Sequence, residues 1–406
     1  MTAWKKYRLG EFAEINPRIS LKQGNEYSFV EMKDLDAMLK YVSPSTKKEL
    51  KGGSKFENGD TLFARITPCL ENGKICQAKN LENNVGFGST EFLVFRGKRE
   101  ISDTNFVYYL TKNDYVKNKA IQMMTGTSGR QRVEKSALEN LEIFAPDLPT
   151  QTRIAQILTS FDDKIELLGQ MNQTLETMAQ TIFKEWFIDF NFPGFDEELV
   201  DGLPKGWRKG KLGEIVDKIS KGTTPTQKDL ENLEVSVPFL KVKDINDNGI
   251  VSIENVEFIP VEVHNKQLKR SILETNDILF SIAGTIGRVA ILDNSLNNSN
   301  CNQAIAFIRL KDKEKHLEFV YLWLKNEIIQ NFINSSIVQG VQANVSLTVL
   351  NNIDIIIPDQ INICYWINVI KPIFSKITNN QHQIRTLTHL RDTLLPKLMS
   401  GAVKVE

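Results

Sequence analysis

A column of apolar residues repeats at every seventh position in the middle of the chain. Its members are Ile154, Phe161, Leu168, Leu175 and Ile182. Further apolar residues widen this column into a stripe: Ile157, Met171 and Met178. A seven-residue repeat predicts an amphipathic helix that packs its narrow apolar stripe against one partner helix. Because no proline follows Pro149 in this stretch, we expect a single helix of about 35 residues, roughly 50 Å long.

The segments on the two sides of this helix repeat each other. The matches are 4–11 with 207–214, 58–64 with 275–281, 106–110 with 319–323, and 138–146 with 350–358. Residues 58–64 and 275–281 are typical of a turn followed by a short strand, whereas 106–110 and 319–323 have helical periodicity. Because all matches keep the same order, we predict a duplicated structural unit.

The same offset predicts a second long helix near the carboxyl end. Its apolar column contains Ile377, Ile384, Leu387 and Leu394. Asn380 falls in this column, where it either is buried and fixes the helix register or faces solvent. If a pseudo-twofold axis relates the two halves, the two helices run antiparallel as a coiled coil.

The predicted fold is therefore α+β, with two duplicated mixed α/β domains separated by two long helices. We place the first domain at residues 1–150, the first helical region at 151–195, the second domain at 196–360 and the second helical region at 361–406. A dumb-bell of fixed length would follow from this organisation.

Net charge is zero over the whole chain but uneven along it. The four segments carry +4, −3, −5 and +4 in chain order, so the two helical regions have opposite signs. The four cysteines and four histidines lack metal-ligand spacing, and we expect no metal site, no disulfide and buried, reduced thiols. No apolar run is long enough for a membrane span, which predicts a soluble, cytoplasmic protein without a membrane partner.

Catalytic motifs are not apparent in the sequence. It contains no phosphate-binding Gly-x-x-x-x-Gly-Lys loop, no dinucleotide-binding fingerprint and no nucleophile elbow. Three classes of function remain: a protein that reads DNA, an unusual nuclease or other enzyme, and a coiled-coil scaffold that binds only protein.

Polar and basic loops at corresponding places in both domains favour the first class. Arg, Asn and Gln can make paired contacts to base edges, and Lys, Ser, Thr and glycine amides suit phosphate oxygens. In the first domain the candidate DNA-binding residues are Arg65, Thr67, Asn72, Lys74, Thr127, Ser128, Arg130, Gln131 and Arg132. In the second domain they are Lys221, Thr285, Arg288, Asn302, Gln303, Gln342 and Asn344.

The chain closely resembles the specificity subunit of type I restriction-modification enzymes over essentially its whole length. The resemblance rests on residues 4–11 and 207–214, 67–74, 88–92, 146–154, 203–207, 284–287 and 302–304. Residues 358–366 depart from the family pattern and leave the start of the second helix open.

This resemblance implies a subunit without catalytic activity or cofactor of its own. Each target-recognition domain would read one half of a bipartite site in double-stranded DNA. The helical spacer would set the distance between half-sites and dock two methyltransferase subunits, and two restriction subunits would join the complex. S-adenosylmethionine, ATP and Mg²⁺ would be used by those partners.

Overall fold

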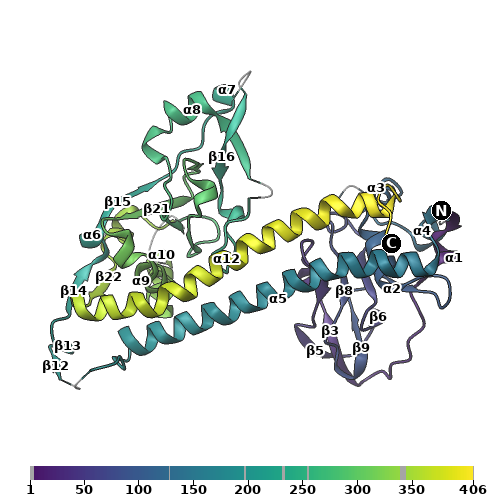
Figure 1. Ribbon diagram of the computed structural model, residues 1–406, viewed down its shortest axis with the longest axis horizontal. Helices are drawn as coiled ribbons and strands as arrows, with labels where there is room; N and C mark the ends of the chain where they lie inside the picture. Colours follow the sequence, from purple (N-terminus) through teal and green to yellow (C-terminus); the bar gives the residue numbers. More distant parts are fainter. Residues whose placement is uncertain are drawn as a thin grey trace. The chain divides into compact units, whose positions relative to one another are not determined.

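The structure is a computed structural model that describes residues 4–127, 129–195, 198–230, 234–253, 256–338 and 344–405 (Figure 1). The chain folds into two compact units, Met1–Gln170 with Asn380–Glu406, and Met171–Asn379. We call these unit 1 and unit 2. Each contains a globular part and one portion of each long helix, α5 (Leu148–Phe187) and α12 (Gln360–Met399).

Unit 1 is built on two sheets and a short two-stranded ribbon. The five-stranded sheet has the order β2 (Ala13–Ile15), β10 (Phe92–Gly97), β7 (Thr61–Ala64), β8 (Ile75–Ala78) and β4 (Tyr41–Val42). The four-stranded sheet has the order β5 (Thr46–Glu49), β3 (Glu26–Val30), β9 (Val85–Gly88) and β6 (Ser54–Glu57). The ribbon pairs β1 (Lys5–Arg8) with β11 (Glu142–Ala145).

The helices of unit 1 complete its core. They are α1 (Leu9–Phe12), α2 (Thr104–Lys112), α3 (Asp114–Gln122) and α4 (Lys135–Glu139), with short 3-10 turns at Met32–Asp34 and Glu82–Asn84. Helix α2 begins where the Asp103 carboxylate accepts a hydrogen bond from the Phe106 amide, a standard N-cap. Its apolar residues pack in one core with Ile154 and Leu158 of α5 and Leu398 of α12.

Unit 2 repeats this plan with different sheet sizes. The four-stranded sheet has the order β15 (Val216–Lys221), β21 (Ile305–Leu310), β18 (Ile278–Ser281) and β19 (Val289–Ile291). The three-stranded sheet has the order β17 (Glu257–Pro260), β16 (Val235–Leu240) and β20 (Asn300–Cys301). Two ribbons pair β12 (Leu199–Val200) with β13 (Leu203–Pro204), and β14 (Arg208–Lys211) with β22 (Asp354–Ile357).

The remaining elements of unit 2 are helical. They are α6 (Leu212–Ile215), α7 (Gln227–Leu230), α8 (Val261–Asn265), α9 (Lys313–Lys325), α10 (Glu327–Val338) and α11 (Leu347–Asn351). Short 3-10 turns lie at Val242–Asp244, Lys269–Ser271 and Asn294–Leu296.

The prediction of a duplicated unit is confirmed by individual contacts. Arg96 forms an ion pair of 2.6 Å with buried Asp60 in unit 1, and Arg309 forms one of 2.7 Å with buried Asp277 in unit 2. Both pairs link the strands that lie side by side in the larger sheet, β10 with β7 and β21 with β18. In each case the hydrogen bond to the aspartate is the main cause that raises the arginine pKa.

The two long helices run antiparallel within each unit. In unit 1, Asp162 of α5 contacts Arg391 of α12, and in unit 2, Trp186 of α5 contacts Trp366 of α12. The expected first helix is 40 residues long, since it begins at Leu148 and accommodates Pro149 in its first turn. The second helix begins at Gln360.

The apolar columns predicted from the heptad pattern are buried in part. Ile154, Leu168 and Ile377 are buried, and the half-buried members are Phe161, Leu175, Ile182, Ile384, Leu387 and Leu394. The prediction is wrong for Ile157 and Met178, which are exposed.

Polar residues occupy several of the most buried helix positions instead. Asp162 and Asn172 lie in the contact face of α5, and the Asn172 amide donates to the Ile377 carbonyl oxygen at 3.4 Å. Asn380 is fully buried, so the alternative that it faces solvent is wrong. Buried polar side chains are retained where a hydrogen-bond partner compensates for the loss of water.

A polar cluster joins the globular part of unit 1 to both helices. Arg391 donates through Nη1 to Asp162 Oδ1 at 2.7 Å, and the Tyr109 hydroxyl donates to Asp162 Oδ2 at 2.5 Å. Nearby, buried Lys40 donates to Thr159 Oγ1 at 2.6 Å, and burial lowers the pKa of this lysine to about 8.

An aromatic cluster joins the globular part of unit 2 to both helices. The Phe187 ring lies 4.9 Å from Trp366 and 4.8 Å from Phe319, both edge to face. Trp366 is fully buried and also contacts Phe183 and Trp186. Besides its apolar core, each unit therefore has a side-chain cluster at the helix pair, which contains a buried ion pair in unit 1 and a group of aromatic rings in unit 2.

Candidate nucleic-acid interface

Two loops that are separated in sequence lie against each other in unit 1. The Thr67 amide donates to the Gln131 carbonyl oxygen and the Gln131 amide donates to Thr67 Oγ1, both at 3.0 Å. The Val133 amide donates to the Arg65 carbonyl oxygen at 2.9 Å. The structure therefore brings the candidates Arg65 and Thr67 into contact with residues 131–133.

Two of the three arginines of this surface, Arg65 and Arg132, are each paired with a glutamate. Arg132 contacts both carboxylate oxygens of Glu91, with the shortest distance 2.7 Å, and this pairing raises the arginine pKa. Arg65 Nη2 lies 2.8 Å from Glu134 Oε1. Sequence reasoning did not identify Glu91 or Glu134, because nothing local to either residue indicates which arginine it meets.

The tip of the second loop is exposed. The Thr125 and Arg132 backbones exchange two hydrogen bonds of 2.9 Å, which close the loop at its base. Thr127 and Arg130 project into solvent beyond this base. Ser128 lies outside the described residues.

The candidates at the end of the first loop differ in availability. The Asn72 side chain is exposed, at a turn where its amide donates to the Pro68 carbonyl oxygen. Lys74 is half-buried, and its ammonium donates to the Met32 carbonyl oxygen at 2.8 Å. In this structure Lys74 ties the loop to the neighbouring segment.

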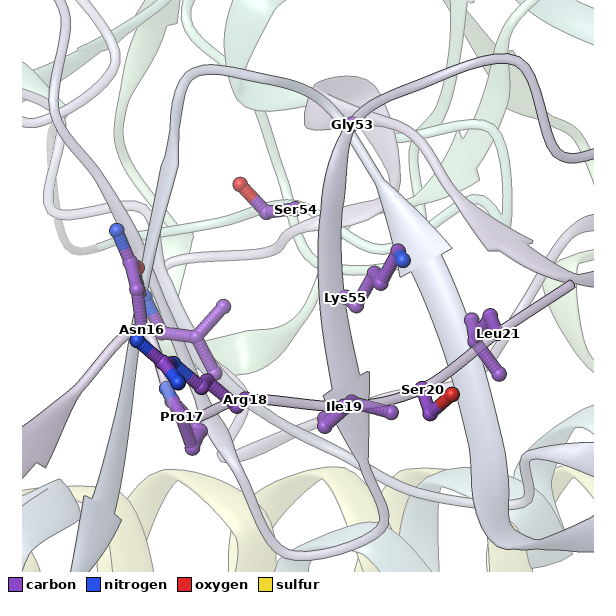
Figure 2. A pocket seen from close by; sticks show the side chains of 10 residues that line it. Asn16, Pro17, Arg18, Ile19, Ser20, Leu21, Gly53, Ser54 and Lys55 are labelled. Atoms are coloured by element: carbon purple, nitrogen blue, oxygen red, sulfur yellow. Dashed lines mark hydrogen bonds between the residues drawn. The ribbon is translucent and has the colours of Figure 1, made fainter. Parts of the chain in front are cut away.

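A polar hollow of about 690 Å³ lies beside this surface, between residues 16–21 and β6. Figure 2 shows Arg18 next to Asn16 at one side of the hollow and Lys55 farther along it. The hollow adjoins the turn that carries Glu91, because Ser54 Oγ donates to the Phe92 carbonyl oxygen at 2.7 Å. The sequence analysis missed Arg18 and Lys55. It did include Lys221 at the end of β15, which is the residue of unit 2 that corresponds to Arg18 in the repeat.

Unit 2 reproduces the backbone of this surface with other side chains. The Val345 amide donates to the Ile282 carbonyl oxygen at 2.9 Å, as Val133 does to Arg65 in unit 1. The Ile282 amide donates to Ala304 at 2.8 Å, as the Arg65 amide does to Glu91 at 3.0 Å. Exposed Asn344 thus takes the position of Arg132, and Ala304 that of Glu91.

Other candidates of unit 2 gather at the same edge. Lys221 is exposed at the end of β15, and Gln303 is paired with Thr224 through their side chains. Asn302 Oδ1 accepts from the Ala304 amide at 3.2 Å and so shapes the turn. Gln342 lies outside the described residues.

Thr285 and Arg288 belong to the loop after β18. Thr285 is exposed. The Arg288 guanidinium donates to Asp247 Oδ1 at 2.7 Å and to the Ile245 carbonyl oxygen at 2.8 Å. Arg288 therefore holds the segment after Val242–Asp244 in this structure.

The described part of the chain contains neither a cluster of metal ligands nor a helix that could cross a membrane. No cluster of three or more His, Cys, Asp or Glu side chains there could hold a metal ion. No helix there has the length and apolar character needed to cross a membrane. The four cysteines are free thiols. Cys76 and Cys301 are buried as expected, but Cys69 is half-buried and Cys364 is exposed, so the expectation of burial is wrong for Cys364 and holds only in part for Cys69.

Two similar units that carry different side chains on equivalent loops are typical of modular recognition proteins. Comparison with known proteins identifies the family of this chain. The protein-family model described as "Type I restriction modification DNA specificity domain" matches residues 1–177 and 204–387. The chain belongs to this family.

Several known proteins are similar to the chain over nearly its whole length. The type I restriction enzyme MjaIX specificity subunit of Methanocaldococcus jannaschii is 29% identical, covering 99% of this chain and 94% of that protein. The HindI specificity subunit of Haemophilus influenzae is 27% identical, covering 99% and 100%. The crystal structure of the S subunit from M. genitalium has the same fold, with a TM-score of 0.56, 17% identity and coverage of 98% and 96%.

Proposed function

We propose that this chain is the DNA-sequence-specificity subunit of a type I restriction-modification complex. Unit 1 reads one half of a bipartite site in double-stranded DNA, and unit 2 reads the other half. The paired long helices set the distance between the half-sites and dock two methyltransferase subunits. Two restriction subunits complete the assembly, which acts in the cytoplasm.

The proposal rests on one observation: the two units share a backbone framework but present different side chains on it. The bonds from Val133 to Arg65 and from Val345 to Ile282 hold equivalent loops in equivalent positions. On that framework unit 1 carries Arg132 where unit 2 carries Asn344. Since arginine pairs best with guanine and asparagine with adenine, the two surfaces suit different base sequences.

Phosphate contacts come from the basic residues beside these loops. Arg18 and Lys55 line the hollow of unit 1, and no acidic residue appears among its lining residues. In unit 2, Lys221 and Arg270 flank the turn of Thr223, whose hydroxyl accepts from Arg270 at 2.9 Å. Affinity from such contacts falls as salt rises, because bound counterions are released from DNA.

Catalysis belongs to the partner subunits in this proposal. The methyltransferases use S-adenosylmethionine, and the restriction subunits use ATP and Mg²⁺. The chain itself binds no cofactor and cuts no DNA.

The decisive experiment exchanges residues 1–150 for those of a relative of different specificity. The full chain is co-expressed with its methyltransferase, and methylated adenines are mapped by single-molecule sequencing. We expect one half of the methylated motif to change and the other half to persist. A matched control restores residues 65–74, 88–92 and 125–132 of this chain in the exchanged protein, and should return the original half-site.

Two results would contradict the proposal. One is a methylated motif that stays the same in both halves after the exchange. The other is DNA cleavage by the purified chain alone with Mg²⁺, since that would make the chain itself a nuclease.

A further inference from the structure

The Arg132 guanidinium is held from one side by a single carboxylate. Its Nε lies 3.0 Å from Glu91 Oε1 and 2.9 Å from Oε2, and its Nη2 lies 2.7 Å from Oε1. This side-on pairing uses the Nε hydrogen and one hydrogen of Nη2. It fixes the plane of the guanidinium relative to the loop.

The hydrogens that remain match the acceptors of one base. Nη1 also donates to the Arg130 carbonyl oxygen at 3.3 Å, which accounts for one of its two hydrogens. Among the described residues, no acceptor takes the second hydrogen of Nη1 or of Nη2. Two N–H groups on neighbouring nitrogens are what the O6 and N7 atoms of guanine accept in the major groove. The side chain is 39% exposed, enough for a base edge to reach it.

Both members of the pair are anchored through their backbones. The Glu91 amide donates to Ser89 Oγ at 3.2 Å, and its carbonyl oxygen accepts from the Arg65 amide at 3.0 Å. Arg132 is fixed by its two backbone bonds with Thr125. A side chain held in place before binding loses less conformational entropy when the complex forms.

We propose that Arg132 reads a guanine in the half-site of unit 1, with Glu91 as the residue that positions it. This inference rests on the proposed function, because it requires unit 1 to bind DNA.

Arg65 and Arg288, two other candidates, are not arranged in this way. Arg288 is turned towards carbonyl oxygens inside unit 2. Arg65 has a side chain that is 19% exposed and meets its glutamate through one nitrogen. In unit 2 the equivalent pair is Asn344 and Ala304, which lacks a guanidinium, so this guanine contact belongs to unit 1 alone.

The test removes one acceptor from the DNA and one donor from the protein. Complexes of the full chain with its methyltransferase are titrated with duplexes that carry the methylated motif. Each guanine of the unit 1 half-site is replaced in turn by 7-deazaguanine, which lacks N7. For the unchanged chain we expect one guanine whose replacement weakens binding on the order of 10-fold.

The Arg132→Ala variant should bind the natural motif on the order of 10- to 100-fold more weakly. It should also become insensitive to 7-deazaguanine at that one position and respond as the unchanged chain does at every other position. Arg99→Ala is the matched control, because Arg99 carries the same charge in the same unit and its side chain is 94% exposed. This control should keep the full guanine discrimination.

The Glu91→Gln variant tests the positioning role separately. It keeps the shape of the side chain but removes the charge, and we expect reduced discrimination at the guanine read by Arg132. A purely structural role would lower the melting temperature and leave this discrimination unchanged, and that outcome would overturn the role of Glu91.

Two outcomes would overturn the role of Arg132. In one, Arg132→Ala weakens binding to all sequences alike. The slope of the logarithm of the binding constant against the logarithm of the salt concentration then falls in magnitude by about 1, as expected for a lost phosphate contact. In the other, the unit 1 half-site contains no guanine. Failure of the proposed function would look different, since the unchanged complex would then show no sequence-specific binding at all.

Discussion

Replacing Arg391 by alanine removes the cation that pairs directly with Asp162 in the buried cluster of unit 1. The Arg391 side chain is 9% exposed and that of Asp162 is 2% exposed, so water cannot take over the lost contact without entering the core. Burial is the largest single effect on Arg391 and lowers its pKa, but the charges of Asp162 and Asp392 and the hydrogen bonds to them together outweigh burial, so the arginine pKa is raised. The carboxylate would keep only the Tyr109 hydroxyl as its hydrogen-bond donor among the described side chains.

The expected loss is large because a buried charge is left without its partner. Removal of one member of a buried ion pair costs about 3–5 kcal/mol. The hydrogen bond from Arg391 to the Met38 carbonyl oxygen, 3.2 Å long, is lost as well. Contact with exposed Asp392 contributes little, since ion pairs open to solvent are worth at most about 1 kcal/mol.

Hydrogen exchange of the full chain in urea, followed by mass spectrometry, can assign the loss to unit 1. Amides of α2 should open roughly 150- to 5,000-fold more often in the Arg391→Ala variant, in line with a loss of about 3–5 kcal/mol. Amides of β18 and β21 in unit 2 should be unaffected. The matched control is Lys371→Ala on the same helix, whose partner Glu314 is 82% exposed, and which should change stability by less than about 1 kcal/mol.

The reasoning is refuted if Arg391→Ala and Lys371→Ala change stability equally. A double-mutant cycle with Asp162→Asn isolates the interaction itself. A coupling free energy well below 1 kcal/mol would mean that the pair contributes packing and not charge.

Three other predictions concern pH, packing and length. Burial lowers the pKa of Lys40 to about 8. Unit 1 should therefore gain stability as the pH rises from about 8 to 10.5, because the unfolded chain binds more protons than the folded chain in this range. The gain should appear as a higher urea midpoint of unfolding, and Lys40→Met should remove it. Trp366→Ala should destabilise unit 2 by about 3–5 kcal/mol in the same exchange assay, because it empties the centre of the aromatic cluster. Matched insertions of four residues in α5 and α12 should lengthen the helix pair by about 6 Å and widen the gap in the methylated motif by roughly two base pairs.

The repeat and the long helices could be predicted because their signals are local. A heptad column and matching segments in fixed order need no knowledge of distant contacts. The heptad pattern wrongly predicted that Ile157 and Met178 are buried. It counts only apolar residues, so it could not predict that a polar residue, Asp162, is one of the most buried positions of the helix. That position depends on Arg391 and Tyr109, which come from distant parts of the chain.

The residue types of the candidate surface could be predicted from the sequence, but the residues that pair with them could not. Composition and repeat position pointed to the loops of Arg65 and Arg132, and the structure places those loops together. Their glutamates could not be predicted, because Glu91 reaches Arg132 only after β9 and β10 have paired within their sheets. The hollow of Arg18 and Lys55 likewise forms between segments that are far apart in sequence.

The division of the chain has a consequence for its synthesis on the ribosome. Unit 2 is one continuous segment, Met171–Asn379, whereas unit 1 combines Met1–Gln170 with Asn380–Glu406. Its core includes Leu398 and Met399, and its ion pair needs Arg391. The part of the protein that is translated first must therefore wait for the part that is translated last, and Asp162 stays without its cation while all of unit 2 emerges.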